Sequence, residues 1–328
     1  MCRRALPYVQ PTIGTLSSEP RPPRLCRTDY NVGMERVVRA AIVEACLRDD
    51  AGGSPTGAVI AEGLSVASCR ALPDRWATSH VGVVARAPLN GAWPVRFFTA
   101  VAELAGCGHG TIAVHALLNE SRSAGEISSA QITGGRRFEV RSRSRGDAVE
   151  VWFDQGTVAV RPAEPRAAAE AAEALGLASS ELAIDDPPVV ASSSTPRLLI
   201  AVAEHERLWS ARPDQQRLAE LCRRNGWLGC FLYHRVGARA DGRARAAARM
   251  FAPAIGVSED IANANSAGCL AAHLTATGRE NVVEVDQGDA LGRPSRIWAR
   301  ANQAGRVWRT WVGGLARVAH EVTVPPRA

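Results

Sequence analysis

Short runs of apolar and β-branched residues, separated by Gly, Pro and Asp, dominate the first half of the chain. This pattern predicts strands at 35–46, 57–63, 80–87, 94–101, 129–135, 136–143 and 148–154. Residues 106–120 differ, because glycines lead into apolar positions at helical spacing. The pattern therefore predicts one glycine-entered helix among many strands.

The second half repeats this plan. An Ala- and Glu-rich helix is expected at 162–177, and a second glycine-entered helix at 263–278. Strands are expected at 197–205, 229–236, 282–288, 295–301, 306–314 and 316–324. Aligning 106–118 with 264–276 places a small-residue helix entrance at the same point of each half, although abundant Ala and Gly can produce such similarity by chance.

These elements predict an α+β fold with two domains. The composition changes near residue 159, so we predict domains at 34–158 and 159–311, with the final strands near 312–328 returning to the first. Residues 1–33 combine Pro and charge with few periodic apolar positions, and are expected to be a disordered tail or a start assigned too early.

Composition excludes several functions. All 39 basic residues are Arg, so a Lys Schiff base and a Walker A phosphate loop are both excluded. The eight Cys include no CxxC pair, which predicts free thiols and no zinc cluster. Although the net charge is +6, the arginines are scattered among acidic residues, so no nucleic-acid partner is expected. No membrane-spanning run or signal peptide is evident, which predicts a cytoplasmic protein.

The two glycine-led helix entrances carry the candidate chemistry. A helix N-terminus offers unpaired N–H groups and partial positive charge, which favour an anion. Polar and titratable groups gather at the two entrances: Glu103, Cys107 and His109 at the first, and Asp260, Asn263, Asn265 and Ser266 at the second. The structural alternatives are ordinary glycine caps, a packed His109 and an N-cap role for Asp260.

Four motifs in order resemble those of the PhzF-like phenazine-biosynthesis family, which shares the diaminopimelate epimerase fold. They are SPTGAVIAE (54–62), ELAGCGHGTIA (103–113), the segment 248–274 and DQGDALGRPSRI (286–297). The resemblance implies two similar domains related by a pseudo-two-fold axis, each a curved mixed sheet around a central helix. It also implies an isomerase of small anionic metabolites, without cofactor or metal, and commonly a homodimer.

The resemblance also identifies site residues and two departures. His109 and Asp260 stand where the family has a proton-transfer histidine and aspartate. His80 replaces the family's glutamate, and Asn265 its serine. Imidazole titrates near neutral pH, so His80 is predicted to be the base, and its protonated form would attract an anion. The alternative is a site that only binds a metabolite or constrains its cyclisation.

A thiol mechanism is a further alternative, because Cys107 stands where diaminopimelate epimerases have their first catalytic Cys. Their second aligns with Asn263, so the pair is incomplete. The remaining predicted substrate-binding residues are Gly108, Gly110, Thr111, Asn263, Asn265, Ser266, Cys107 and Arg293. Arg293 could instead form a structural ion pair. Cys269, His115, His273 and most of the eight Trp are predicted to be core residues.

The sequence thus predicts a cofactor-independent isomerase of specialised metabolism. His80, His109 and Asp260 are its expected catalytic residues, and Asn265 its expected substrate hydrogen-bond donor.

Overall fold

The computed structural model describes residues 36–123 and 125–324, and the expected tail at 1–33 lies outside them. The described residues form one compact unit. The strands of its first half are β1 (Arg36–Leu47), β2 (Ser54–Glu62), β3 (Val81–Val84), β4 (Ala92–Phe98), β5 (Glu103–Leu104), β6 (Glu126–Thr133), β7 (Arg136–Arg145) and β8 (Ala148–Pro162). The strands of its second half are β9 (Val189–Ser192), β10 (Pro196–Ala201), β11 (Cys230–Ala238), β12 (Ala244–Ala252), β13 (Val257–Asp260), β14 (Val282–Gln287), β15 (Ser295–Ala304) and β16 (Val307–Glu321). The α-helices are α1 (Val66–Arg75), α2 (Gly108–Ser121), α3 (Pro165–Ala174), α4 (His205–Ser210), α5 (Gln215–Asn225) and α6 (Ala264–Ala276).

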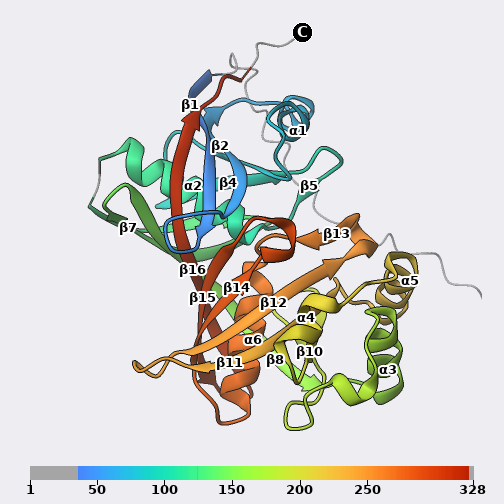
Figure 1. Cartoon of the computed structure of the whole chain (residues 1–328). Coiled ribbons are helices and arrows are strands. Elements are labelled where there is room, and N and C mark those ends of the chain that lie inside the picture. Colours follow the sequence, from blue (N-terminus) through green and yellow to red (C-terminus); the bar gives the residue numbers. More distant parts are fainter. Residues whose placement is uncertain (1–35, 124, 325–328) are drawn as a thin grey trace, which may run out of the picture. The chain divides into compact units, whose positions relative to one another are not determined.

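The strands pair in two closed rings that share β8 and β16 (Figure 1). One ring runs in the order β8-β7-β6-β4-β3-β2-β1-β16. The other runs in the order β8-β9-β10-β11-β12-β14-β15-β16. Both contain parallel and antiparallel pairs, such as parallel β2–β3 and β10–β11. Helix α2 packs on strands of the first ring and α6 on strands of the second, so the predicted α+β fold is confirmed.

Helices α2 and α6 are buried on almost every side, which is why their sequences are apolar all round. His115 in α2 and His273 in α6 are both buried, as predicted. Cys269 is also buried, and the six cysteines of the described residues are free thiols. Among the helices of residues 36–123 and 125–324, none is long and apolar enough to cross a membrane.

The expected strands 306–314 and 316–324 are one strand, β16, so the predicted break between them was wrong. Gly313 lies between Trp152 and Trp298 on the neighbouring strands. A Cβ at this position would lie 2.6 Å from the Trp152 ring. Glycine is therefore required here for close packing, and the two indoles stack with centroids 5.9 Å apart.

The prediction that most tryptophans are core residues is confirmed for five of the eight. Trp93, Trp227 and Trp311 are buried, and Trp76 and Trp308 are partly buried and pack against the core. Trp152 and Trp298 are half-buried and stack on each other.

Helices α1, α4 and α5 were not predicted. Helix α5 does carry the expected end signals, since Asp214 caps its first turn and Gly226 ends it with φ 66°. Strand β8 continues to Pro162, past the predicted domain boundary at residue 158. The end of β16 pairs with β1, from Leu315 opposite Leu47 to Glu321 opposite Ala41.

Candidate active site

Helix α2 begins without a side-chain cap. Cys107 is the N-cap residue in extended conformation, and its side chain accepts no capping hydrogen bond. Gly108 and Gly110 keep this turn close to its neighbours: a Cβ on Gly108 would lie 2.6 Å from Cβ of Ala264, and one on Gly110 2.8 Å from the Phe97 ring. The uncapped first turn of α2 therefore packs directly against the first residue of α6.

His109, in this first turn, is held by two contacts. Its Nδ1 lies 3.2 Å from the carbonyl oxygen of Ala262, and its Nε2 lies 3.3 Å from Sγ of Cys107. Because a carbonyl can only accept, Nδ1 carries a proton and donates it. Only 4% of His109 is exposed, so the ring has little freedom to turn away.

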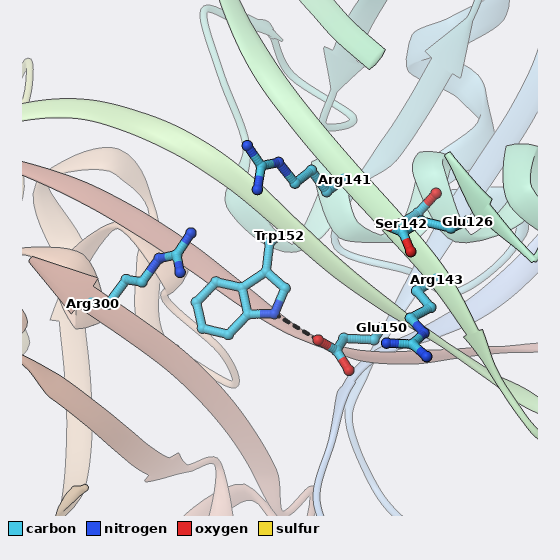
Figure 2. Close-up of a pocket in the computed structure, with 7 residues that line it drawn as sticks. All are labelled: Glu126, Arg141, Ser142, Arg143, Glu150, Trp152 and Arg300. Atoms are coloured by element: carbon cyan, nitrogen blue, oxygen red, sulfur yellow. Dashed lines mark hydrogen bonds between the residues drawn. The ribbon is translucent and has the colours of Figure 1, made fainter. Parts of the chain in front are cut away.

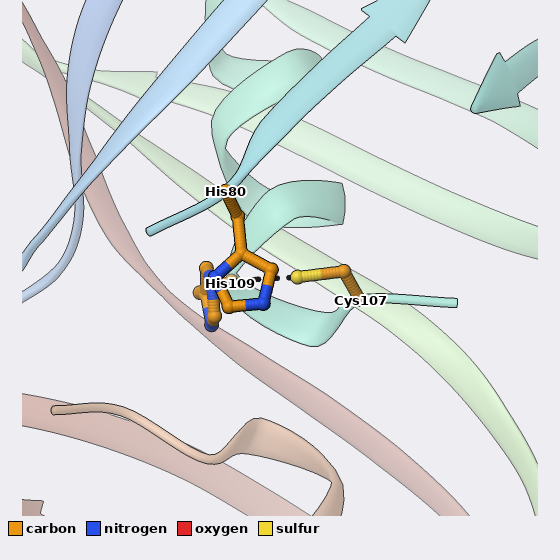
Figure 3. A group of neighbouring side chains, drawn as sticks. All are labelled: His80, Cys107 and His109. Atoms are coloured by element: carbon orange, nitrogen blue, oxygen red, sulfur yellow. Dashed lines mark hydrogen bonds between the residues drawn. The ribbon is translucent and has the colours of Figure 1, made fainter. Parts of the chain in front are cut away.

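His80 precedes β3 and lies beside His109, as the close-up shows (Figure 3). The two ring centroids are 4.6 Å apart and the ring planes meet at 78°. The Nδ1 of His80 lies 2.8 Å from the hydroxyl oxygen of Ser79. The predicted pair of imidazoles is thus brought together, although the two residues are 29 positions apart in the sequence.

The two imidazoles differ in protonation. Burial and the positive charge of His109 together lower the pKa of His80 to about 3, against the attraction of Asp260. For His109, burial also disfavours the charged form, but Cys107, Asp260 and the Ala262 carbonyl together raise its pKa to about 9. At neutral pH one proton therefore resides on His109, and His80 is a neutral imidazole. The protonated His80 that we expected to attract an anion is not favoured.

Asp260 ends β13, and Asn263 precedes α6. Asn263 is the N-cap of α6, because its Oδ1 accepts a hydrogen bond from the Ser266 amide at 2.9 Å. The predicted alternative of an N-cap role for Asp260 was wrong. Asp260 instead accepts hydrogen bonds from Asn263 Nδ2 at 2.9 Å and from the Ala262 amide at 3.4 Å. The carboxylate is therefore fixed beside the helix, where it acts on both imidazoles.

The motif 286–297 holds the loop from Asp260 to Asn263 in place, a role that the sequence did not reveal. Buried Gln287 donates from Nε2 to the Asp260 carbonyl at 2.6 Å and accepts from the Asn263 amide at 3.2 Å. The hydroxyl of Ser295 donates to the carbonyl of Ile261 at 2.9 Å. The amide of Gln287 thus ties both ends of the loop together.

Two predicted substrate ligands have other partners. Thr111 is buried and its hydroxyl donates to the Cys107 carbonyl at 2.9 Å. Ser266 is fully buried, and its hydroxyl faces the Met250 sulfur at 3.7 Å. Asn265 is only half-buried, which leaves its side chain as the more accessible polar group at the start of α6.

Two other predicted residues lie next to residues of opposite charge. Arg293 lies 3.9 Å from Glu44, with 43% of its side chain exposed. Glu103 forms two hydrogen bonds with Arg96, at 2.8 and 2.7 Å, and these lower the pKa of its carboxyl group. Glu103 is therefore committed to an exposed ion pair.

Cys46 was missed because it is the last residue of a predicted strand, 35–46, and no motif includes it. It has φ 65°, at a register shift of β1 against β16, and is fully buried. Burial raises the pKa of its thiol, and the negative charge of Asp260 raises it further. Cys46 therefore lies close enough to the site for Asp260 to affect its pKa, and it is a neutral thiol.

Three side chains form a group that could hold a metal ion, which the spacing of Cys and His in the sequence did not indicate. One ligand atom each from His80, Cys107 and His109 lies within 4.8 Å of the other two. Spacing could not reveal this group, because His80 comes from a separate part of the chain.

A separate cavity of about 230 Å³ is lined by residues of β6, β7, β8 and β15 (Figure 2). Its lining is Glu126, Arg141, Ser142, Arg143, Glu150, Trp152 and Arg300. The guanidinium of Arg300 lies over the Trp152 ring at 5.4 Å, and Glu150 accepts a hydrogen bond from the indole at 2.9 Å. None of the predicted site residues lines this cavity.

Comparison with known proteins agrees with this geometry. Residues 53–321 match the family model described as phenazine biosynthesis-like protein. The chain belongs to this family. An isomerase of Deinococcus radiodurans whose function is uncharacterized is 32% identical over 245 residues, which cover 72% of this chain and 78% of the relative. A trans-2,3-dihydro-3-hydroxyanthranilate isomerase of Pseudomonas fluorescens is 29% identical, over 67% of this chain and 74% of its own.

Solved structures confirm the family fold. A PhzF-family phenazine biosynthesis protein of Bacillus anthracis has a TM-score of 0.75 at 17% identity, covering 88% of this chain and 98% of that one. A predicted epimerase of Pseudomonas aeruginosa has a TM-score of 0.73 at 25% identity, covering 87% and 98%. The family relatives are named isomerases, and this chain is an isomerase of the same family.

Proposed function

We propose that this chain is a cofactor-independent isomerase of specialised metabolism that moves a proton, and with it a double bond, on a small anionic metabolite. His80 replaces the family glutamate as the base. The observation that carries the proposal is the pair of imidazoles, with centroids 4.6 Å apart, of which one is neutral and the other protonated at neutral pH. A base and an acid in one site are what a proton shift between two carbons requires.

In the proposed reaction, neutral His80 removes a proton from a carbon next to an imine, enol or diene. Protonated His109 then gives its proton to another carbon of the same molecule, and the double bond moves between them. His80 is left positive and His109 neutral. Transfer of one proton between the adjacent rings restores the starting state, and Asp260 stabilises the positive charge on either ring.

The uncapped start of α2 is proposed to hold the anion. Its backbone N–H groups and the helix dipole favour a negative charge at Cys107–Gly110. The side chain of Asn265 would donate a further hydrogen bond, since Ser266 is directed to Met250. A homodimer remains a prediction of the resemblance.

The two alternatives receive less support. A binding protein or cyclisation template does not require two imidazoles in different protonation states. A two-thiol racemase requires a second accessible thiol opposite Cys107, where Asn263 caps α6 instead.

Incubation of candidate unsaturated carboxylates in heavy water tests the proposal. The native chain should place deuterium on carbon in the product, and His80→Ala should lower the rate by about 10²- to 10⁴-fold, the usual contribution of a general base. His80→Glu, which introduces the family's residue, should recover part of the rate. Product formation without deuterium incorporation, unchanged in His80→Ala, would favour the template alternative.

A further inference from the structure

The contact between Cys107 and His109 has the dimensions of one edge of a metal site. In tetrahedral zinc sites the metal lies about 2.3 Å from sulfur and about 2.0–2.1 Å from nitrogen, so two ligand atoms are roughly 3.5 Å apart. Sγ of Cys107 and Nε2 of His109 are 3.3 Å apart. The ligand atom of His80 lies within 4.8 Å of these two atoms. A side-chain movement of about 1 Å would bring all three ligand atoms to the spacing that one zinc ion requires.

The hydrogen bonds of the two imidazoles also leave the Nε2 atoms of His80 and His109 as the nitrogens that can bind an ion. The carbonyl oxygen of Ala262 keeps a proton on Nδ1 of His109, so Nε2 is the nitrogen that faces Cys107 and that can give up its proton to bind an ion. Ser79 contacts Nδ1 of His80 and so leaves Nε2 of that ring for an ion. Backbone or side-chain partners on the second nitrogen are a regular feature of metal-binding histidines.

We propose that His80, Cys107 and His109 form a binding site for one Zn²⁺ ion. Two imidazoles and a thiolate are ligands that zinc prefers, and the fourth position would stay open to water or a carboxylate. Binding displaces the proton on Nε2 of His109 and requires Cys107 as the thiolate, and the released protons go to solvent. The negative charge of Asp260, which acts on both imidazoles, offsets the positive charge that remains.

Zinc binding and proton transfer exclude each other. The metal occupies the imidazole lone pairs on which the proposed proton transfer depends, so the zinc-bound protein would be inactive until the ion leaves. The binding site itself does not depend on the proposed function, whereas the inhibition does.

Titration of the full-length, chelator-treated protein with Co²⁺ tests the site, because a thiolate ligand gives cobalt an intense near-ultraviolet charge-transfer band. We expect one equivalent of Co²⁺ to bind and Zn²⁺ to displace it. Cys107→Ser should abolish the charge-transfer band. His80→Ala and His109→Ala should each weaken Zn²⁺ binding at least about tenfold. Circular dichroism shows whether each variant is folded.

Two control variants separate this site from other thiols and imidazoles. Cys269→Ala removes a buried core thiol, and His205→Ala removes one ring of the pair His205–His234, whose centroids are 5.7 Å apart. Both should leave the band and the affinity unchanged. The proposal is overturned if no charge-transfer band forms, if the band survives Cys107→Ser, or if the His80→Ala protein, still folded, binds Zn²⁺ as tightly as the native chain.

The heavy-water assay separates this inference from the proposed function. If one equivalent of Zn²⁺ stops deuterium incorporation and a chelator restores it, both stand. If Zn²⁺ binds as expected but the metal-free protein incorporates no deuterium, the metal site stands and the isomerisation mechanism fails.

Discussion

Helices α2 and α6 occupy corresponding places in the two strand rings, but their N-terminal turns are completed differently. The Asn263 side chain caps α6, whereas Cys107 leaves α2 uncapped. The uncapped turn also carries His109, with His80 beside it. The two helix entrances therefore differ as binding sites. The cap satisfies a backbone N–H group at the start of α6, whereas the N–H groups at the start of α2 remain available to a ligand.

The same contrast continues inside the helices. His115 and His273 fall at the same point of the aligned segments 106–118 and 264–276, and both are buried. His115 donates to the neutral amide of Gln131 at 3.0 Å, whereas His273 lies 2.6 Å from the carboxylate of Asp186. Asp186 thus provides α6 with a charged partner for its imidazole that α2 lacks.

The largest expected effect concerns the contact between the two entrances. Gly108→Val places a side chain where even a Cβ would lie 2.6 Å from Ala264, so the α2 turn must shift. We expect deuterium exchange to fall about 10²-fold, as a misplacement near 1 Å can cause, and stability to fall by about 1–3 kcal/mol. Gly106→Ala is the matched control, because its added Cβ would meet no atom within 4 Å. Equal activity in both variants would contradict the role of this contact.

A smaller effect is expected from the pH dependence of His115. Burial lowers its pKa to about 4, although the hydrogen bond to Gln131 opposes this, while the unfolded chain has the ordinary value near 6.5. Between these values the unfolded state binds more protons, so the stability contribution is complete above about pH 6.5 and is lost as pH falls. We expect His115→Leu to remove about 2 kcal/mol of the stability difference between pH 7 and pH 5.

Urea unfolding of both proteins at the two pH values measures this difference. A His115→Leu protein with the same loss of stability on acidification as the native chain would show that another group is responsible.

The smallest effect tests the cap that distinguishes α6. Asn263→Ala removes its side-chain hydrogen bonds to the Ser266 amide and to Asp260. We expect thermal or urea unfolding to show a loss of about 1 kcal/mol. Asn265→Ala should change stability by less than about 0.5 kcal/mol, yet slow deuterium exchange if Asn265 binds substrate. An equal loss of stability in both variants would mean that the cap is not specific to Asn263.

Much of this arrangement could be predicted from the sequence. Apolar residues on all sides of 106–120 and 263–278 identified the two buried helices, and the family motifs identified His80, His109 and Asp260. The strand patterns identified most of the sheet, but they missed β5, β9, β12 and β13 and divided β16 near Gly313, where glycine serves close packing.

The remaining features depend on contacts between distant residues. Gln287 and Ser295 hold the Asp260 loop across β14 and β15, and no local pattern marks them. Ser266 matched a substrate-binding position by sequence, but its buried hydroxyl faces Met250. The grouping of His80, Cys107 and His109 could not be predicted from spacing, because His80 and Cys107 meet only in the folded chain.

The central claim is that one proton resides on His109 and leaves His80 free to act as the base. Nitrogen-15 NMR of the metal-free, histidine-labelled protein measures this without a substrate, with His80→Gln and His109→Gln used to assign the signals. We predict that His109 is protonated at pH 7 and titrates near pH 9, and that His80 stays neutral down to about pH 4. A protonated His80 beside a neutral His109 at pH 7 would contradict the account.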